Sequence, residues 1–146
     1  MTYALDTNIV SYILRENESI AMRESAAVKS RLAMEIARNN DIVIPPIVYY
    51  EIKRWLNTAG AEKKERMFKR LCADADMSIK QIELDTAALI YSDLKQRGKP
   101  TTDADILIAS FCMVNEYTLV TNNTKHFVDI ENLAYVNWID NQADII

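Results

Sequence analysis

The stretch that decides the fold reads Tyr3-Ala4-Leu5-Asp6-Thr7-Asn8, a short apolar run that ends on an acid. Apolar residues then recur at helical spacing, at Ile9, Val10, Ile13 and Leu14. This order predicts a strand followed at once by a helix. Open α/β sheets bind ligands in the crevice outside the carboxyl ends of their strands. We therefore expect Asp6 to face a binding site, with capping of its own helix as the alternative role.

Strands and helices alternate along the rest of the chain. Short apolar or alternating runs predict further strands at 41–44, 79–84, 117–120 and 133–136. Helical spacing predicts one or two helices over 18–40, and helices at 45–60, 61–75, 85–98 and 103–115, with 121–126 as a polar loop. This alternation predicts an α/β fold, with a parallel sheet covered by helices on both faces.

Length and composition are typical of a single ordered domain over residues 1–146. The chain is 49% hydrophobic and contains only two glycines and three prolines. Cys72 and Cys112 lack a Cys-x-x-Cys or histidine partner, so we interpret them as buried thiols in a reducing cytosol. Neither a leader peptide nor a run of about 18 apolar residues is present. We expect a cytoplasmic protein that does not enter the membrane.

The overall charge opposes non-specific binding to nucleic acids. Lys and Arg total 17 against 21 Asp and Glu, which gives a net charge of −4. Phosphate affinity comes mainly from basic side chains that release counterions. A substrate made of nucleic acid would therefore need bound cations or a local basic patch.

Several acids follow the ends of different predicted strands. Glu51 lies in the first turns of the helix after strand 41–44, Asp103 and Asp105 open a later helix, and Asn123 follows strand 117–120. Parallel strands end at one edge of a sheet, so we expect these residues around one pocket with Asp6. Clustered carboxylates repel one another unless cations join them, and Mg²⁺ or Mn²⁺ suits such oxygen ligands. Each acid taken singly could instead be a helix cap or a solvated charge.

Four motifs in this order resemble PIN-domain proteins, and more narrowly the VapC-type toxins of toxin–antitoxin pairs. They are Leu5-Asp6-Thr7-Asn8, Tyr50-Glu51-Ile52, the segment 103–109 and the segment 120–127. The resemblance runs from residue 1 to about residue 138. It implies a three-layer α/β/α fold around a mostly parallel sheet of four to five strands. The stretch 15–40 is longer than in compact toxins of this type, which implies longer or extra helices there.

The resemblance also implies an activity and a set of site residues. The family members are Mg²⁺-dependent endoribonucleases, whose metal ligands match Asp6, Glu51 and Asp105. Asn123 stands at the family's fourth acidic position, where an amide is a weaker ligand, and Asp103 is a candidate to restore the missing charge. Thr7 and Thr121 would then hold the carboxylates in place. Further implied features are a cognate antitoxin, a homodimer and an RNA substrate such as tRNA.

Two other functions compete with this one. A phosphatase of the haloacid-dehalogenase type also has an acid after its first strand, but it needs a second aspartate where Asn8 stands. A PIN-like scaffold that binds RNA or protein without cutting is favoured by Asn123 and opposed by Asp6, Glu51 and Asp105.

Basic residues flank the predicted pocket on both sides. Lys53 and Arg54 follow Glu51, and Arg97 and Lys99 precede Asp105, so all four are candidates to bind RNA phosphates. Ordinary solvated charge is the alternative for each. The single histidine, His126, adjoins Phe127, and we interpret it as a packing or capping residue rather than a general base.

Overall fold

The computed structural model of the protein describes residues 1–16 and 21–140. Four strands and seven helices occupy these residues. The strands are β1 (Thr2–Leu5), β2 (Asp41–Val43), β3 (Thr118–Val120) and β4 (Tyr135–Val136). The helices are α1 (Thr7–Leu14), α2 (Met22–Ala37), α3 (Pro46–Ala59), α4 (Glu62–Leu71), α5 (Gln81–Gln96), α6 (Asp103–Val114) and α7 (Thr124–Phe127).

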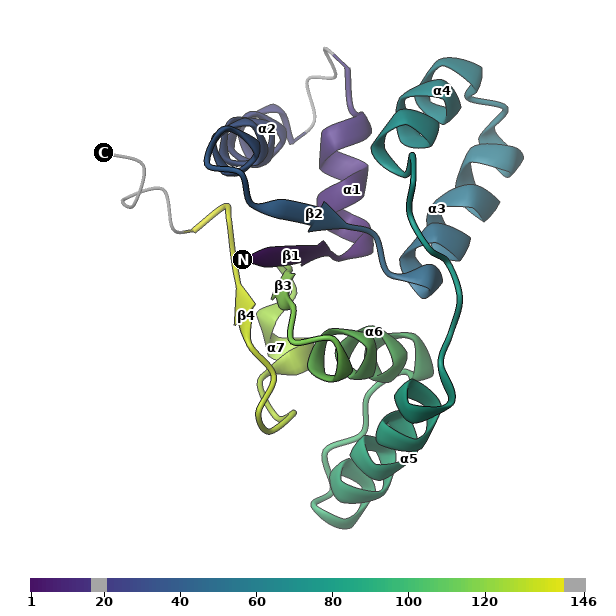
Figure 1. Ribbon diagram of the computed structural model, residues 1–146, viewed down its shortest axis with the longest axis vertical. Coiled ribbons are helices and arrows are strands. Elements are labelled where there is room, and N and C mark those ends of the chain that lie inside the picture. The colour runs from purple at the N-terminus through teal and green to yellow at the C-terminus, as the bar shows by residue number, and fades with distance from the viewer. Residues whose placement is uncertain (17–20, 141–146) are drawn as a thin grey trace.

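The strands form one parallel sheet in the order β2-β1-β3-β4. Helices α1 and α2 lie on one side of the strands, α6 and α7 lie on the other, and α3 and α4 stand beside α1 (Figure 1). The central strand β1 is buried from Tyr3 to Leu5, because it pairs with β2 and β3 along both edges. This arrangement confirms the predicted α/β class and a parallel sheet of four strands.

In the core, the first strand packs against Trp138, near the end of the described chain. Trp138 is almost fully buried, and its ring meets that of Tyr3 edge-on, with ring centroids 5.5 Å apart. Leu5, Ile9 and Ile52 belong to the same apolar cluster. The sheet edge that carries Asp6 therefore rests on a packed interior.

One predicted strand is wrong. Residues 79–84 lead into α5, which begins at Gln81, and Asp85 lies inside that helix rather than at its cap. Ile82 and Leu84, which suggested an alternating strand, are 58% and 49% exposed, whereas Glu83 between them is 3% exposed. Glu83 Oε2 accepts a hydrogen bond of 3.0 Å from the backbone N–H of Lys80 and so caps the helix.

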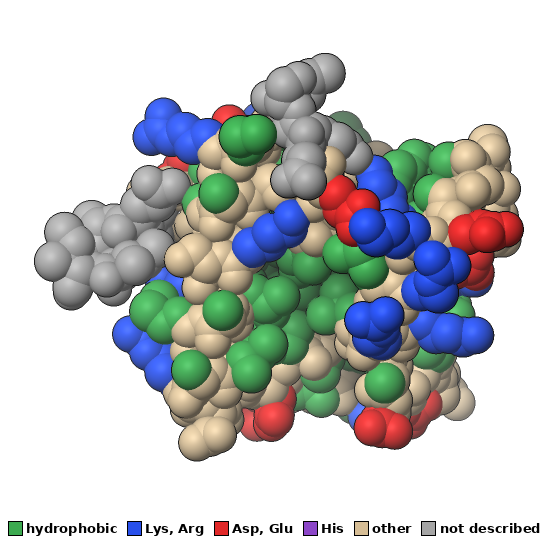
Figure 2. Space-filling model, turned by 90° about the horizontal axis from the view of Figure 1, so that it is seen from above, with side chains coloured by type: hydrophobic (Ala, Val, Ile, Leu, Met, Phe, Trp, Pro, Cys, Tyr) green, Lys and Arg blue, Asp and Glu red, His purple; other side chains and the backbone are tan. Residues whose placement is uncertain are grey.

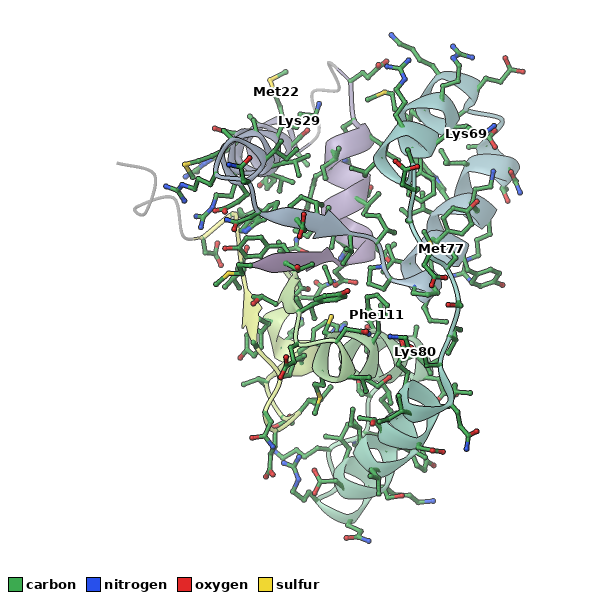
Figure 3. The ribbon with its side chains drawn as sticks, in the orientation of Figure 1. Met22, Lys29, Lys69, Met77, Lys80 and Phe111 are labelled. Atoms are coloured by element: carbon green, nitrogen blue, oxygen red, sulfur yellow. The ribbon has the colours of Figure 1, made fainter. Side chains whose placement is uncertain are left out.

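The start of α5 is also fastened to the end of α6. Lys80 Nζ donates to Asn115 Oδ1 at 2.9 Å, and Asn115 in turn donates to the carbonyl of Phe111 at 2.8 Å. Figure 3 shows Lys80 and Phe111 at this junction. These tertiary contacts stabilise a helix from Gln81 onward, although the alternating apolar residues predicted a strand.

The remaining differences are mostly element boundaries. The predicted loop 121–126 contains the short helix α7, and the last strand is confined to Tyr135–Val136. The predicted helical stretch 18–40 contains the single helix α2, while residues 17–20, like 141–146, lie outside the described part. Within that part, none of the helices is long and apolar enough to cross a bilayer.

The two cysteines are free thiols. Cys112 is buried as predicted, whereas Cys72 is only half-buried and lines a surface cavity. Burial raises the pKa of the Cys72 thiol to about 11 and that of Cys112 further still. Both thiols are therefore protonated and unreactive at neutral pH.

Candidate active site

Asp6 stands between β1 and α1, and both of its carboxylate oxygens are held. Oδ1 accepts a hydrogen bond of 2.8 Å from the backbone N–H of Thr7, which makes Asp6 the N-cap of α1. Oδ2 accepts a hydrogen bond of 2.7 Å from the hydroxyl of Thr121. The backbone N–H of Asp6 donates to the carbonyl of Val120 at 2.9 Å, which continues the pairing of β1 with β3. The capping alternative is thus correct, and it fixes the carboxylate at the edge of the sheet.

Thr7 connects Asp6 to Glu51. Its backbone N–H binds Asp6, and its hydroxyl donates to Glu51 Oε1 at 2.8 Å. Glu51 lies on the second turn of α3, since Pro46 begins that helix, and its side chain is 22% exposed. Its second oxygen, Oε2, lies 3.8 Å from the guanidinium of Arg54, one turn further along. The predicted role of Thr7 in holding a carboxylate therefore has a direct structural counterpart.

Asp105 lies in the first turn of α6, whose N-cap is Thr102. The hydroxyl of Thr102 accepts from the backbone N–H of Asp105 at 3.2 Å. Asp105 Oδ2 accepts a hydrogen bond of 3.3 Å from the hydroxyl of Thr101 and lies 3.3 Å from His126 Nδ1. His126, which we interpreted as a packing or capping residue, thus has a half-exposed ring that contacts an acid of the site.

The loop after β3 completes this edge. Thr121 is fully buried, and its hydroxyl accepts a hydrogen bond of 3.0 Å from the backbone N–H of Asn123 while it donates to Asp6. Asn122 donates to the hydroxyl of Tyr12 at 3.2 Å and accepts from Asn8 at 3.5 Å. One hydroxyl thus joins Asp6 to the loop that carries Asn123, as predicted for Thr121.

The pKa of Asp6 reflects its burial and the negative charges of the two other acids. Burial is the main cause that raises the pKa of Asp6, and the negative charges of Asp105 and Glu51 raise it further. Hydrogen bonds from Thr121 and Thr7 act in the opposite direction, but the net shift is upward. Asp6 is 5% exposed, so its ionised form lies in a poorly solvated place beside two other acids. A cation would relieve this unfavourable charge.

The donor set fits a hydrated magnesium ion. Among residues 1–16 and 21–140, no group of three Asp, Glu, His or Cys side chains is arranged so that it could hold a metal ion by itself. Mg²⁺ does not require such a cage, since it keeps several waters and binds through one or two carboxylates and substrate phosphates. Asp6, Glu51 and Asp105 supply hard oxygen ligands without a thiol or imidazole cluster.

Asp103 is separated from this group. It is exposed at the first position of α6 and makes no hydrogen bond or ion pair with any described residue. Two residues along a helix correspond to a rotation of about 200°, so Asp103 and Asp105 point to different sides. The structure brings Asp6, Glu51 and Asp105 together and leaves Asp103 apart.

The four predicted RNA-binding cations divide into two pairs. Arg54 lies beside Glu51, and Lys99 lines a cavity of about 380 Å³ next to Asp105. Lys53 instead forms an ion pair with Glu65. Arg97 is held by Asp93 at 2.6 Å and by the carbonyl of Asp129.

The cavity around Lys53 is separate from the one beside Asp105. It has a volume of about 410 Å³ and is also lined by Lys69 and Met77, which Figure 3 labels. Thr101 was not named from the sequence, and His126 was not assigned to the site; only the position of Thr101 four residues before Asp105 offered a signal.

Comparison with known proteins follows this geometry. The family model described as PIN domain matches residues 3–133. The chain belongs to the PIN-domain family. Ribonuclease VapC2 of Rickettsia felis is 32% identical to this PIN domain, over 94% of this chain and 98% of the relative. Ribonuclease VapC1 of Haemophilus influenzae strain R2866 is 26% identical over the same shares.

Solved structures share the fold of this PIN domain. VapBC2 from Rickettsia felis, bound to a DNA fragment from its promoter, has a TM-score of 0.79 and 27% identity, covering 94% of this chain and 99% of that chain. FitAcB from Neisseria gonorrhoeae has a TM-score of 0.73 and 23% identity, covering 93% and 97%. The predicted resemblance to VapC-type PIN domains is confirmed.

Proposed function

We propose that this PIN domain is a metal-dependent endoribonuclease, the toxin of a VapBC-type toxin–antitoxin pair, with Mg²⁺ as its cofactor and Mn²⁺ as a substitute. One observation carries the proposal. Asp6 is a buried carboxylate whose pKa is raised by burial and by the neighbouring charges of Asp105 and Glu51. A fold that only needed a helix cap would gain nothing from two further acids beside it.

In this proposal, three acids would hold the ion and two threonines would orient the acids. Asp6, Glu51 and Asp105 would hold the ion, and Thr7 and Thr121 keep two of these carboxylates oriented through bonds of 2.8 and 2.7 Å. When bound, the ion neutralises the carboxylates and stabilises the charge that develops on the phosphate during water attack. Asn123, whose backbone N–H donates to Thr121, would supply a neutral amide to substrate or water. Asp103, exposed at the start of α6, would only add negative charge at the periphery of the site.

The named relatives support the substrate class. Two of them carry the name ribonuclease and match 98% of their own length. By resemblance, the products would be a 5′-phosphate and a 3′-hydroxyl, and structured RNA such as tRNA would be the substrate. Arg54 and Lys99 lie nearest the acids and would contact phosphates. Lys53 and Arg97 would need to exchange their present partners to do so.

An antitoxin partner and a homodimer belong to the same proposal. Three of the solved relatives are VapBC assemblies. Figure 2 shows a hollow lined by hydrophobic side chains between α2 and the side formed by α3 and α4. Such a surface suits the apolar face of a partner helix. The pair would act in the cytoplasm, where RNA is available.

The test is cleavage of total RNA by the purified protein with Mg²⁺, with and without EDTA. The Asp6→Asn variant removes the ionised carboxylate at nearly unchanged shape, and Asp85→Asn, at an exposed position of α5, is the matched control. We expect cleavage by the wild type and the control only, and only with the metal. Cleavage that persists in EDTA or in Asp6→Asn would refute the metal-nuclease function. Tight RNA or protein binding without cleavage would favour the non-cutting scaffold.

A further inference from the structure

We infer that the cavity beside Asp105 is a nucleotide subsite, which holds the RNA residue next to the bond that is cut. This inference rests on the proposed function and deepens it, because it adds Lys125 and His126 to Lys99 as substrate-binding residues. The cavity measures about 380 Å³, within the range of about 300–1,000 Å³ for small-molecule sites. Its walls come from the end of α5, the connector 99–102, the start of α6 and α7.

The cavity shares a wall with the catalytic acid. Thr101 and His126 both line it, and each lies 3.3 Å from Asp105 Oδ2. Asp105 itself also lines the cavity, so a group bound there lies directly beside a proposed metal ligand. That position is suitable for a neighbouring nucleotide of a substrate whose scissile phosphate lies at the acids.

Two lysines, Lys99 and Lys125, line the cavity together with two acids, Asp105 and Asp129. Lys125 is exposed at its rim and forms no ion pair with any residue in 1–16 or 21–140. Lys99 lies 3.9 Å from Asp129 Oδ1, at the limit of an ion pair, with 54% of its side chain exposed. A phosphate needs a cation that is not already neutralised, and Lys125 meets this need. Asp129 limits the contribution of Lys99, so Lys125 is the main phosphate contact.

The other walls suit a base and a ribose. The imidazole of His126 is 46% exposed, and the exposed ring of Pro100 and the nearly buried Leu94 also line the cavity. RNA bases stack on aromatic side chains, histidine included, without strong sequence preference. The hydroxyl of Thr102 accepts from a backbone N–H, so its own proton can be donated to a ligand oxygen. Cation, stacking surface and hydroxyl together match one nucleotide.

The first experiment uses His126 as a reporter, because it is the only histidine of the chain. A protein without a histidine tag gives a single set of imidazole signals in the NMR spectrum. We expect a single-stranded RNA hexamer of mixed sequence, added in EDTA at constant pH, to shift these signals in a saturable way. An acidic peptide of equal charge should leave them unchanged. Equal shifts with the peptide would reduce the cavity to a general anion site and overturn the inference.

The second experiment measures hexamer affinity by fluorescence anisotropy in EDTA at several salt concentrations. Lys125→Ala should weaken binding about five- to tenfold and lower the salt slope by about 0.7, the value for one contact to a single strand. Lys69→Ala, the same change in the separate cavity of about 410 Å³, is the matched control and should bind like the wild type. Equal affinity of Lys125→Ala and the control would overturn the inference.

The outcomes separate this inference from the proposed function. Binding in EDTA does not depend on the metal or on cleavage. If the wild type cleaves RNA but Lys125→Ala binds the hexamer as tightly as the wild type does, the proposed nuclease function stands and the proposed subsite fails. If Lys125 and the His126 signals respond to RNA but no RNA is ever cut with Mg²⁺, the nucleotide site stands and the nuclease fails.

Discussion

Asp6 combines a structural and a chemical role in one side chain. As the N-cap of α1 it receives the Thr7 N–H, and its second oxygen receives the Thr121 hydroxyl. These bonds position a charge that burial makes unfavourable, as the upward shift of its pKa indicates. Burial of this carboxylate therefore disfavours its ionised form in the metal-free fold, a cost that the proposed ion-binding role accounts for.

The first prediction concerns Asp6→Asn without metal. A raised pKa in the folded state means that the folded protein binds the proton more tightly than the unfolded chain. The contribution of Asp6 is then most favourable below its unfolded pKa, and it is lost as pH rises through the folded pKa. Asparagine keeps the cap without the ionisation. In EDTA we expect the variant to be more stable than the wild type at pH 7.

Thermal unfolding between pH 4 and pH 8 checks this expectation. The advantage of Asp6→Asn should shrink as the pH falls and Asp6 of the wild type becomes protonated. A variant that is less stable than the wild type at pH 7 would show that the charge of Asp6 stabilises the metal-free fold.

Glu35 is also buried, but its environment lowers the pKa of its carboxyl group instead of raising it. Its side chain is 1% exposed and accepts hydrogen bonds from Arg31 at 2.7 Å and Asn40 at 2.6 Å. Burial alone would raise its pKa, yet the hydrogen bonds from Asn40 and Arg31 and the charges of Arg31 and Arg38 lower it overall. Glu35 thereby anchors the end of α2 to the start of β2.

The second prediction is that Glu35→Ala destabilises the fold by about 1–3 kcal/mol at pH 7, because it leaves Arg31 and Asn40 without their acceptor. With a lowered folded pKa, the stabilisation by Glu35 is present above its unfolded pKa and is lost as pH falls through the folded pKa. Chemical denaturation should show a loss that diminishes toward acid pH. Asp85→Ala, at an exposed site, should change stability by less than about 0.5 kcal/mol.

At the scale of elements, the start of α5 shows how tertiary contacts override a local pattern. Glu83 caps the helix through the Lys80 N–H, and Asn115 Nδ2 approaches Glu83 Oε1 at 3.4 Å. The apolar residues around it, Ile82 and Leu84, face solvent.

The third prediction follows from this inversion of polarity. Glu83→Leu should destabilise the protein by about 1–2 kcal/mol, since it removes the cap and a buried hydrogen-bond partner. Ile82→Lys should be nearly neutral at its exposed position. Urea denaturation of both variants decides the matter, and the reverse order of stability would support a strand at 79–84.

The other elements were largely predictable, and the reasons are physical. β1, α1, α3 and α6 carry strong periodic patterns and begin at Asp, Pro or Thr residues that favour such starts. Their order along the chain was enough to place Asp6, Glu51 and Asp105 on one edge. The contact of His126 with Asp105 was not predictable, because it depends on how α7 packs against α6. The partners of Lys53 and Arg97 likewise depend on side-chain packing.

At the scale of the whole molecule, the three acids connect segments that are distant in sequence. Asp6 follows β1, Glu51 lies on α3 and Asp105 lies on α6. A site formed by all three acids exists only in the folded state, so the binding energy of a ligand there adds to the stability of the entire domain.

The fourth prediction is a metal-dependent melting temperature. Above its dissociation constant, each tenfold increase in Mg²⁺ adds about 1.4 kcal/mol to the free energy of unfolding, which corresponds to about 4 °C for a domain of this size. Differential scanning fluorimetry with increasing Mg²⁺ measures this slope. Asp6→Asn should abolish the slope and Asp85→Asn should keep it. Equal slopes in all three proteins would place the ion elsewhere.

The bond between Asp6 and Thr121 spans 115 positions of the chain. During synthesis the first strand leaves the ribosome long before its neighbour β3 does. At about 5–20 residues per second, this gap lasts about 6–23 s. Until β3 and Thr121 emerge, the Asp6 carboxylate lacks one of the two hydrogen bonds that orient it, and Asp105 emerges only shortly before them. For the proposed nuclease, the order of strands in the sheet would delay assembly of the active site until translation is nearly complete.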